Sequence, residues 1–259
     1  MTDAGTLSLQ EEGERLNTIS GVYADFAFDR LMRGYMLRTF RPHLPRLPGG
    51  ARALEMGCHH GEFSALIAPY FSQLEIVDAA ERFLAMTRER LGGRAVFHRS
   101  LFESFTPSGR FDSIFLCHVL EHLIDPVLVL SRARSWLRPG GRLLIAVPNG
   151  MAPSRQIAVE MGVVPSLCAF TEADIREGHR RVYLPDTLAA DVRAAGLRIV
   201  ERGGILFKAL ANFQMDGLLA NGLASKAYLD GCYELGARYP DLCASLYVVA
   251  EDSDAARPA

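Results

Sequence analysis

The chain has 259 residues, of which 49% are hydrophobic, and its 28 basic and 30 acidic residues give a formal net charge of −2. This composition is typical of a folded protein and excludes a chain too polar to form a core. Because there is no basic excess and no apolar run long enough to span a bilayer, we expect neither a nucleic-acid nor a membrane partner.

The five cysteines are scattered along the chain and form no C-x-x-C pair. An odd, scattered set argues against both a disulfide framework and a zinc ribbon. The N-terminal stretch MTDAGTLSLQEEGER is acidic and polar, unlike a secretory signal. We therefore expect a cytoplasmic protein.

Strand and helix patterns alternate through the first part of the chain. An amphipathic helix is predicted over residues 22–40, before a cluster of prolines. Short apolar runs then predict buried strands, separated by segments of helical period. These strands lie at 51–57, 73–79, 95–100, 112–117 and 142–148, and the helices lie at 62–71, 81–91 and 120–137, the last closed by RPGG.

The second part of the chain is mostly helical. Residues 150–195 and 207–242 carry helical and irregular segments, with a helix over 186–195 for which Asp186 is the predicted N-cap. Two further strands are predicted at 197–206 and 244–252. Strands that alternate with helices imply a parallel sheet covered on both faces. We therefore predict an α/β fold with a doubly wound, mostly parallel seven-stranded sheet and a helical cap.

The segment ALEMGCHHGEFS (53–64) carries the strongest local motif. A buried strand ends in Glu55, and Gly57 and Gly61 flank a tight loop before a helix. Glycines let the backbone turn sharply and approach a ligand closely, and the free N–H groups at a helix start attract an anionic group. Asp78, at the end of the next strand, is placed to accept hydrogen bonds from a ribose. The structural alternative is that the glycines only form a turn and that Asp78 only caps the next helix.

Two nucleotide-binding fingerprints are excluded. Counted from Gly57, the second and third positions of G-x-G-x-x-G are His59 and Glu62, so the dinucleotide motif fails. No G-x-x-x-x-G-K-[ST] sequence is present, which removes the P-loop class.

ALEMGCHHGEFS resembles motif I of the class I S-adenosylmethionine-dependent methyltransferases, roughly [DE]-x-G-x-G-x-G. Glu55, Gly57 and Gly61 match this pattern, and His59 replaces the middle glycine. The likeness covers about residues 51–205. It continues through LEIVDAAERF and FDSIFLCHVLEHLIDP, which are close to the small-molecule branch of the family.

The resemblance implies a Rossmann-like methyltransferase fold with S-adenosyl-L-methionine as cofactor and S-adenosyl-L-homocysteine as product. We predict a single methyltransferase domain over 1–259, with 1–50 as a helical lid, 51–150 as the cofactor-binding core, 150–195 and 207–242 as cap inserts, and 197–206 and 244–252 as the last strands.

The resemblance also implies a set of cofactor contacts. Ser100 and Leu101 stand where the family often has an Asp-Leu pair, and Tyr23, Arg30, Arg33 and Tyr35 of the N-terminal segment are candidates for closing over the cofactor. The predicted cofactor-binding residues are Glu55, Gly57, Cys58, His59, Gly61, Asp78, Ala79, Ser100, Leu101, Cys117, His118 and Tyr23.

The segment REGHRRVYLPDTL (176–188) resembles a GH-x-R-x-[FY] segment of many small-molecule methyltransferases, in which the histidine faces the substrate. We predict His179 as the general base, kept neutral by Arg180 and Arg181, with His118 as its rival. The predicted substrate contacts are Asn149, His179, Arg180, Tyr183 and Asn212, and Lys208 and Gln214 are further polar candidates.

A competing motif is H-x-x-E-H, formed by His118, Glu121 and His122, which is typical of one class of zinc peptidases. His118 directly follows an apolar run, so it belongs to a strand–helix junction, and the sequence does not establish that the two histidines share a helix face. A zinc peptidase stays the remote alternative. The methyltransferase resemblance explains the same residues, and we predict no metal site.

The predicted function is methyl transfer from S-adenosylmethionine to a small molecule, such as a sugar, an aromatic compound or a natural-product intermediate. O- or N-methylation is favoured among the O, N, C and S transfers that this fold hosts. The alternative is a module of the same fold that binds the cofactor without catalysis, which the substituted His59 would support. We consider a homodimer as the assembly.

Overall fold

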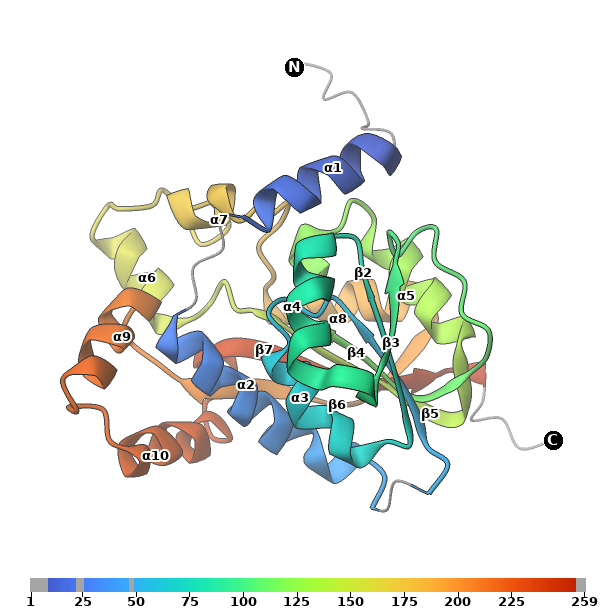
Figure 1. The fold of residues 1–259 in the computed structure, drawn as a ribbon. Helices are drawn as coiled ribbons and strands as arrows, with labels where there is room; N and C mark the ends of the chain where they lie inside the picture. The colour runs from blue at the N-terminus through green and yellow to red at the C-terminus, as the bar shows by residue number, and fades with distance from the viewer. Residues whose placement is uncertain (1–8, 22–25, 47–48, 255–259) are drawn as a thin grey trace.

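The computed structural model describes residues 9–21, 26–46 and 49–254. A seven-stranded sheet lies at its centre, with strand order β3-β2-β1-β4-β5-β7-β6 (Figure 1). Strand β7 runs antiparallel to β5 and β6, and the other neighbouring strands pair in parallel. The predicted fold class is therefore confirmed. The strands are β1 (Arg52–Met56), β2 (Gln73–Asp78), β3 (Val96–Arg99), β4 (Phe111–Cys117), β5 (Leu137–Pro148), β6 (Leu197–Phe207) and β7 (Cys243–Asp252).

Helices cover both faces of the sheet. One face packs against α2 (Ala27–Phe40), α3 (Glu62–Ile67), α4 (Glu81–Leu91) and α10 (Lys226–Gly236), and the other against α5 (Pro126–Ser135) and α8 (Pro185–Ala194). Helix α2 shows why: Phe28, Met32, Met36 and Phe40 recur every four residues and are all buried. Such spacing places one apolar stripe against the sheet.

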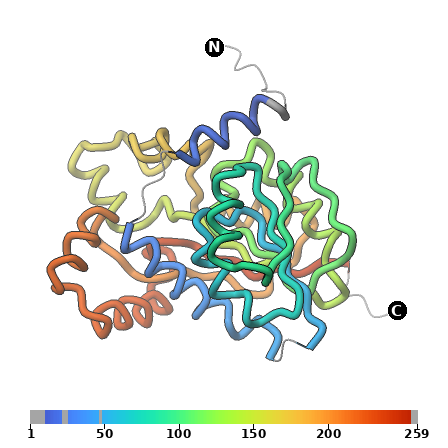
Figure 2. Tube along the Cα trace, in the orientation of Figure 1, coloured from blue at the N-terminus to red at the C-terminus, as the bar shows by residue number. Residues whose placement is uncertain are grey.

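The remaining helices surround one end of the sheet. They are α1 (Leu9–Ile19), α6 (Pro153–Glu160), α7 (Glu172–Arg176) and α9 (Asn212–Ala220); in the view of Figures 1 and 2, α1 lies along the top of the molecule and the other three lie at its left. The two segments predicted as cap inserts therefore contain helices of the cap and helices that pack on the sheet. Leu188 and Val192 of α8 and Leu229 of α10 are buried in the two core clusters, because their apolar stripes complete the layers on the sheet.

The helix predicted over 120–137 is two shorter elements. A 3-10 turn, Leu120–His122, comes first, and α5 begins at Pro126. Proline disfavours a helical conformation for the residue before it but suits the first helical position. Asp125 completes the start, because its side chain accepts a hydrogen bond of 2.9 Å from the Leu128 N–H. The RPGG segment lies within β5, which pairs with β4 at Leu137 and again from Arg142, so these four residues form an irregularity inside the strand rather than a turn before it.

Two further expectations need correction at helix ends. The helix α1 was not predicted, and α2 begins at Ala27, while residues 22–25 of the predicted helix lie outside the described residues. The N-cap of α8 is Leu184, whose N–H donates to Thr187 Oγ1 at 2.9 Å, and Asp186 lies within the first turn.

All five cysteines are among the described residues, and each is a free thiol. Among the helices of the described residues, none is both long and apolar enough to cross a bilayer.

Candidate active site

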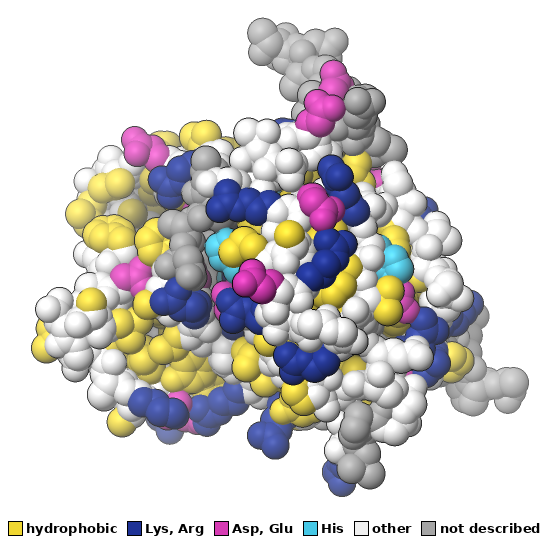
Figure 3. Space-filling model, in the orientation of Figure 1, with side chains coloured by type: hydrophobic (Ala, Val, Ile, Leu, Met, Phe, Trp, Pro, Cys, Tyr) yellow, Lys and Arg dark blue, Asp and Glu magenta, His cyan; other side chains and the backbone are white. Residues whose placement is uncertain are grey.

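A cavity of about 560 Å³ opens where the carboxyl ends of the strands meet the surrounding helices. It is lined by the loops after β1, β2, β4 and β5 and by side chains of α1, α2, α6, α7 and α9. In open parallel sheets ligands bind at this edge, where the strand order reverses, here between β1 and β4. On the face drawn in Figure 3, acidic and basic side chains are intermixed rather than gathered by sign.

The loop after β1 is shaped by two glycines with positive φ. At Gly57 (φ 84°), an added Cβ would lie 2.7 Å from Val119 Cγ2, and Gly57 itself lines the cavity. At Gly61 (φ 78°), the Cβ would lie 3.0 Å from Thr87 Cα of α4. Gly61 is therefore needed for packing of the loop against α4, and it is not among the residues that line the cavity.

His59 occupies the place of the middle glycine of the motif and keeps a backbone conformation typical of glycine. It adopts φ 47°, a left-handed conformation that non-glycine residues rarely take. Its ring packs against His60 in a tilted arrangement, at a centroid distance of 3.9 Å, and lies 5.0 Å from Phe83. Burial lowers the pKa of His59 to about 2, so the ring lining the cavity is neutral. Ring packing thus supports a backbone conformation that glycine supplies in the motif.

Asp78 connects the end of β2 to this loop. Its Oδ2 accepts a hydrogen bond of 3.0 Å from the Cys58 N–H, and its Oδ1 accepts one of 2.8 Å from the Ala80 N–H. Burial raises the pKa of Asp78 above its ordinary value, although these backbone hydrogen bonds oppose the shift. A carboxylate oxygen has a second lone pair, so both oxygens can still accept from hydroxyls in the cavity.

We expect Asp78→Ala to weaken the binding free energy of S-adenosylhomocysteine by about 1–3 kcal/mol, because two hydroxyl donors would lose a buried acceptor. Calorimetric titration of the purified variant measures this. Glu75→Ala is the matched control, since Glu75 is a buried acid of the same strand that bonds Arg52 and His98 away from the cavity. Equal affinity losses in the two variants would contradict a direct contact by Asp78.

Glu55 is a buried carboxyl group that faces the cavity from the end of β1. Its Oε2 has no hydrogen-bond partner within the described residues. Burial raises the pKa of Glu55 to about 8, and the charge of nearby Arg33 acts in the opposite direction. A carboxyl group left without a partner beside a cavity fits a ligand that brings a cationic group.

We expect Glu55 to make cofactor affinity depend on pH. Below about pH 8 the Glu55 carboxyl group is protonated and must lose its proton to bind a cation. We therefore compare the dissociation constant of Glu55→Gln with that of the wild type. The ratio of the variant's constant to the wild-type constant should rise with pH and level off above pH 8. The limiting slope is about tenfold per pH unit. Calorimetry with S-adenosylhomocysteine measures it, and the ratio cancels titration of the ligand itself. A ratio independent of pH would contradict this role.

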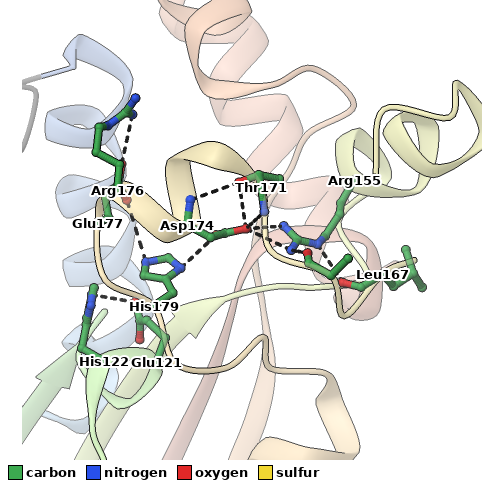
Figure 4. A network of polar contacts seen from close by, with 10 residues as sticks. Glu121, His122, Arg155, Leu167, Thr171, Asp174, Arg176, Glu177 and His179 are labelled. Carbon is green, nitrogen blue, oxygen red and sulfur yellow. Dashed lines mark hydrogen bonds and ion pairs between the residues drawn. The ribbon is translucent and has the colours of Figure 1, made fainter. Parts of the chain in front are cut away.

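A second polar cluster around His179 also lines the cavity (Figure 4). His179 lies in the loop after α7, with Nδ1 2.9 Å from Asp174 Oδ1. Its ring meets the His122 ring edge to face at a centroid distance of 4.7 Å. Burial raises the pKa of Glu121, beside them, to about 7 and lowers the pKa of His122 to about 3.

The predicted electrostatic environment of His179 was wrong. Arg180 pairs with Glu12 of α1 at 2.8 Å, and Arg181 donates to backbone carbonyls such as Leu120 O. Acids surround the imidazole instead: burial lowers the pKa of His179, but the hydrogen bond to Asp174 and the charge of Glu121 outweigh it, so the pKa is raised. The predicted neutralising arginines are directed elsewhere.

His118 also lines the cavity, at the carboxyl end of β4. It adopts φ 56°, and its Nε2 lies 3.0 Å from Ser245 Oγ. Burial lowers the pKa of His118 well below its ordinary value. Its conformation is strained, which is common at functional sites.

The structure divides the other predicted residues into two groups. Asn149 lines the cavity, but its amide donates to Asp241 O and Cys243 O and accepts from Met151 N–H, so it joins β5 to the start of β7. Arg180 and Tyr183 do not line the cavity, and Tyr23 lies outside the described residues. The predicted residues that do line it include Cys58, Ala79, Ser100, Leu101, Cys117 and Asn212.

Tyr183 and Asn212 are both engaged with other side chains. The Tyr183 hydroxyl donates to Asp191 Oδ2 at 2.8 Å, and Tyr183 is almost fully buried. Asn212 donates to Asp29 Oδ1 at 3.1 Å and accepts from Lys208 Nζ. Tyr183 thus holds α8 in place, whereas Asn212 remains at the cavity rim beside α2.

Asp174 and Glu177 are the site residues that the sequence analysis missed. Thr171-Glu-Ala-Asp174 is a capping box, in which the Thr171 hydroxyl accepts from the Asp174 N–H. The [ST]-x-x-[DE] pattern is visible in the sequence and predicts a short helix before the histidine. It could have placed a carboxylate near His179. Of the N-terminal candidates, Arg33 lines the cavity, whereas Tyr35 bonds Asp230 outside it.

The H-x-x-E-H motif does not form the helix that a zinc peptidase uses. His118 has left-handed φ, and Leu120–His122 is a single 3-10 turn. The two histidines therefore do not stand one helical turn apart on one face.

Comparison with known proteins shows which family this chain resembles. A family model described as a methyltransferase domain matches residues 28–202. Ubiquinone biosynthesis O-methyltransferase of Xanthomonas axonopodis pv. citri (strain 306) is 27% identical over 170 residues, which cover 64% of this chain and 70% of that protein. N-methyltransferase NodS from Bradyrhizobium japonicum WM9, solved with S-adenosyl-L-homocysteine, superimposes with a TM-score of 0.59 at 15% identity over 93% of this chain and 98% of that chain.

A further solved structure, the [4+2]-cyclase SpnF, has a TM-score of 0.59 at 18% identity and covers 95% of this chain and 96% of that chain. At such identities the solved structures show the shared fold alone. The family model, in contrast, spans more than half of the 259 residues. This chain belongs to the class I S-adenosylmethionine-dependent methyltransferases, and S-adenosylmethionine is its cofactor.

Proposed function

We propose that this enzyme methylates a hydroxyl oxygen of a small molecule. The observation that carries the proposal is the Asp174–His179 pair, held on the wall of the cavity that also contains the loop after β1. An oxygen nucleophile must lose a proton, and a histidine oriented by a carboxylate is a suitable acceptor. The names of relatives such as the O-methyltransferase of Xanthomonas axonopodis support oxygen as the acceptor atom.

The residues around the loop after β1 fit the cofactor. Gly57 leaves space where a side chain would collide, Asp78 offers two acceptor oxygens, and Glu55 offers an unpartnered carboxyl group. When bound, S-adenosylmethionine supplies a methyl group activated on a sulfonium. We assign the adenosine hydroxyls to Asp78 and a cationic group of the cofactor to Glu55, with Arg33 beside it.

His179 receives the proton at Nε2. Asp174 Oδ1 engages Nδ1, which fixes the tautomer with Nδ1 protonated and leaves the Nε2 lone pair available. Asp174 is itself fixed, because its Oδ2 accepts from the Thr171 N–H at 2.8 Å and from Arg155 Nη2 at 3.1 Å. The ring is therefore oriented before the substrate arrives.

Apolar side chains form a further part of the cavity wall, beside charged residues such as Asp29 and Lys208. Leu16 and Ile19 of α1, Phe28 and Met32 of α2, and Phe213 of α9 face the space beside the polar cluster. Such a wall suits the apolar body of a small metabolite and keeps water from the nucleophile. Because the cavity is recessed between the sheet edge and these helices, we expect a small-molecule acceptor rather than the surface of a macromolecule.

A panel of matched acceptors tests the proposal. Each pair shares a carbon skeleton and differs only in a hydroxyl or an amino group, with transfer followed as labelled methyl and product identified by mass spectrometry. We expect methyl ethers from the hydroxyl members. Transfer to amines alone would overturn oxygen as the acceptor atom, and cofactor binding with no transfer across the panel would favour a binding module.

A further inference from the structure

The cavity contains a group of side chains with the donor types of a metal centre. Glu121, His122 and His179 each present one potential ligand atom, and these three atoms lie within 4.8 Å of one another. Two come from the 3-10 turn after β4 and the third from the loop after α7 (Figure 4). Glu121 is only 2% exposed, and its Oε2 has no hydrogen-bond partner among the described residues. A buried carboxylate oxygen without a partner indicates that an ion or another group binds there.

Outer contacts orient the two imidazoles. Asp174 Oδ1 engages His179 Nδ1 at 2.9 Å, which leaves Nε2 to the cluster, and the His122 ring hydrogen-bonds to the backbone at Gly178. A carboxylate or carbonyl on the far ring nitrogen is the usual outer shell of a metal-binding histidine, because it fixes the tautomer and makes the ligand more basic. Glu177 Oε2, 3.8 Å from His179 Nε2, is a further acid at the site.

We propose that Glu121, His122 and His179 bind a divalent first-row transition cation, such as Mn²⁺, Fe²⁺, Co²⁺ or Zn²⁺. Two imidazoles and one carboxylate suit these ions, whereas Mg²⁺ and Ca²⁺ require oxygen ligands. With metal–ligand bonds near 2.1 Å, tetrahedral ligand atoms lie roughly 3.4 Å apart. The three atoms, which lie within 4.8 Å of one another, are therefore close to the spacing that one cation requires.

The role of the cation rests on the proposed function. Three protein ligands leave a coordination position toward the cavity, where the acceptor oxygen would bind. The cation lowers the pKa of the bound hydroxyl, and the released proton passes to the Glu177 carboxylate, since His179 Nε2 is coordinated. His179 thus acts as base in the cation-free cluster and as ligand in the loaded one.

Direct binding tests the site without any assay of activity. Protein freed of metal with a chelator and then exchanged into chelator-free buffer is titrated with Co²⁺, followed by its visible d–d absorption and by calorimetry. We expect saturation at one Co²⁺ per chain, displacement by Zn²⁺ and no displacement by Mg²⁺. Glu121→Gln, His122→Ala and His179→Ala should each weaken Co²⁺ binding by about tenfold or more, in line with the loss of one ligand.

Two controls keep the result interpretable. His98→Ala removes a histidine that bonds Glu75 outside the cavity and should leave Co²⁺ binding unchanged. Titration with S-adenosylhomocysteine shows that each variant remains folded. Absence of saturable binding, or binding equal in wild type and in all three ligand variants, would overturn the site.

The proposed function and the cation site can fail separately. Saturable Co²⁺ binding together with no transfer to any hydroxyl acceptor would refute the proposed function and support the site. Full transfer to a hydroxyl in the presence of chelator, with no Co²⁺ binding, would support the function and refute the site.

Discussion

Replacing His179 by alanine is expected to lower kcat by about two to four orders of magnitude, the usual contribution of a general base. The expected change in the dissociation constant of S-adenosylhomocysteine is small, because His179 lies in the loop after α7 and not in the loops after β1 and β2 that carry Gly57 and Asp78. The measurement is steady-state turnover of the hydroxyl acceptor found in the panel, together with calorimetry of the cofactor product.

Two variants separate this assignment from its alternatives. His118→Ala removes the other histidine of the cavity, which bonds Ser245 Oγ at 3.0 Å. Asp174→Asn keeps the size of the residue that orients His179, and we expect a smaller fall in kcat than for His179→Ala. Loss of turnover in His118→Ala with normal turnover in His179→Ala would move the base to His118. If neither histidine matters, the acceptor is already nucleophilic and the cavity acts by positioning.

Gly57→Ala is expected to weaken S-adenosylhomocysteine binding by about tenfold or more. An alanine at φ 84° is strained by about 1–2 kcal/mol, and its Cβ would lie 2.7 Å from Val119 Cγ2. Since Val119 is β-branched and stiff, the loop has to move, and Gly57 lines the cavity. Calorimetry measures the affinity, and thermal unfolding shows whether the fold is retained.

Gly140 provides a matched control for strain. It also has positive φ, 76°, but an added Cβ there has no neighbour within 4 Å. Gly140→Ala should therefore cost similar stability and leave cofactor affinity unchanged. The double variant Gly57→Ala/Val119→Ala should recover part of the lost affinity, because it removes the colliding methyl group. Wild-type affinity in Gly57→Ala would show that the loop does not hold the cofactor.

The strand pattern could be predicted from the sequence because buried parallel strands are short, apolar and bounded by turn residues. Each of the seven predicted strands is present, and α4 (Glu81–Leu91) has the predicted bounds. The loop after β1 was equally predictable, since only glycine takes positive φ cheaply at Gly57 and Gly61. The helix over 120–137 was misjudged because Asp125-Pro126 starts a helix, and the apolar period does not reveal this.

The sequence by itself determined the sheet, the glycine-containing loop after β1 and the acid at the end of β2, because these depend on local backbone chemistry and on period. The tertiary structure alone decided the surroundings of His179. Its arginine neighbours in sequence turn to Glu12 of α1 and to backbone carbonyls, while Asp174 and Glu121 come to the ring from other elements. Long arginine side chains pair with groups that are near in space. The pKa of a buried imidazole is likewise set by the charged groups around it in the fold, and not by its neighbours in sequence.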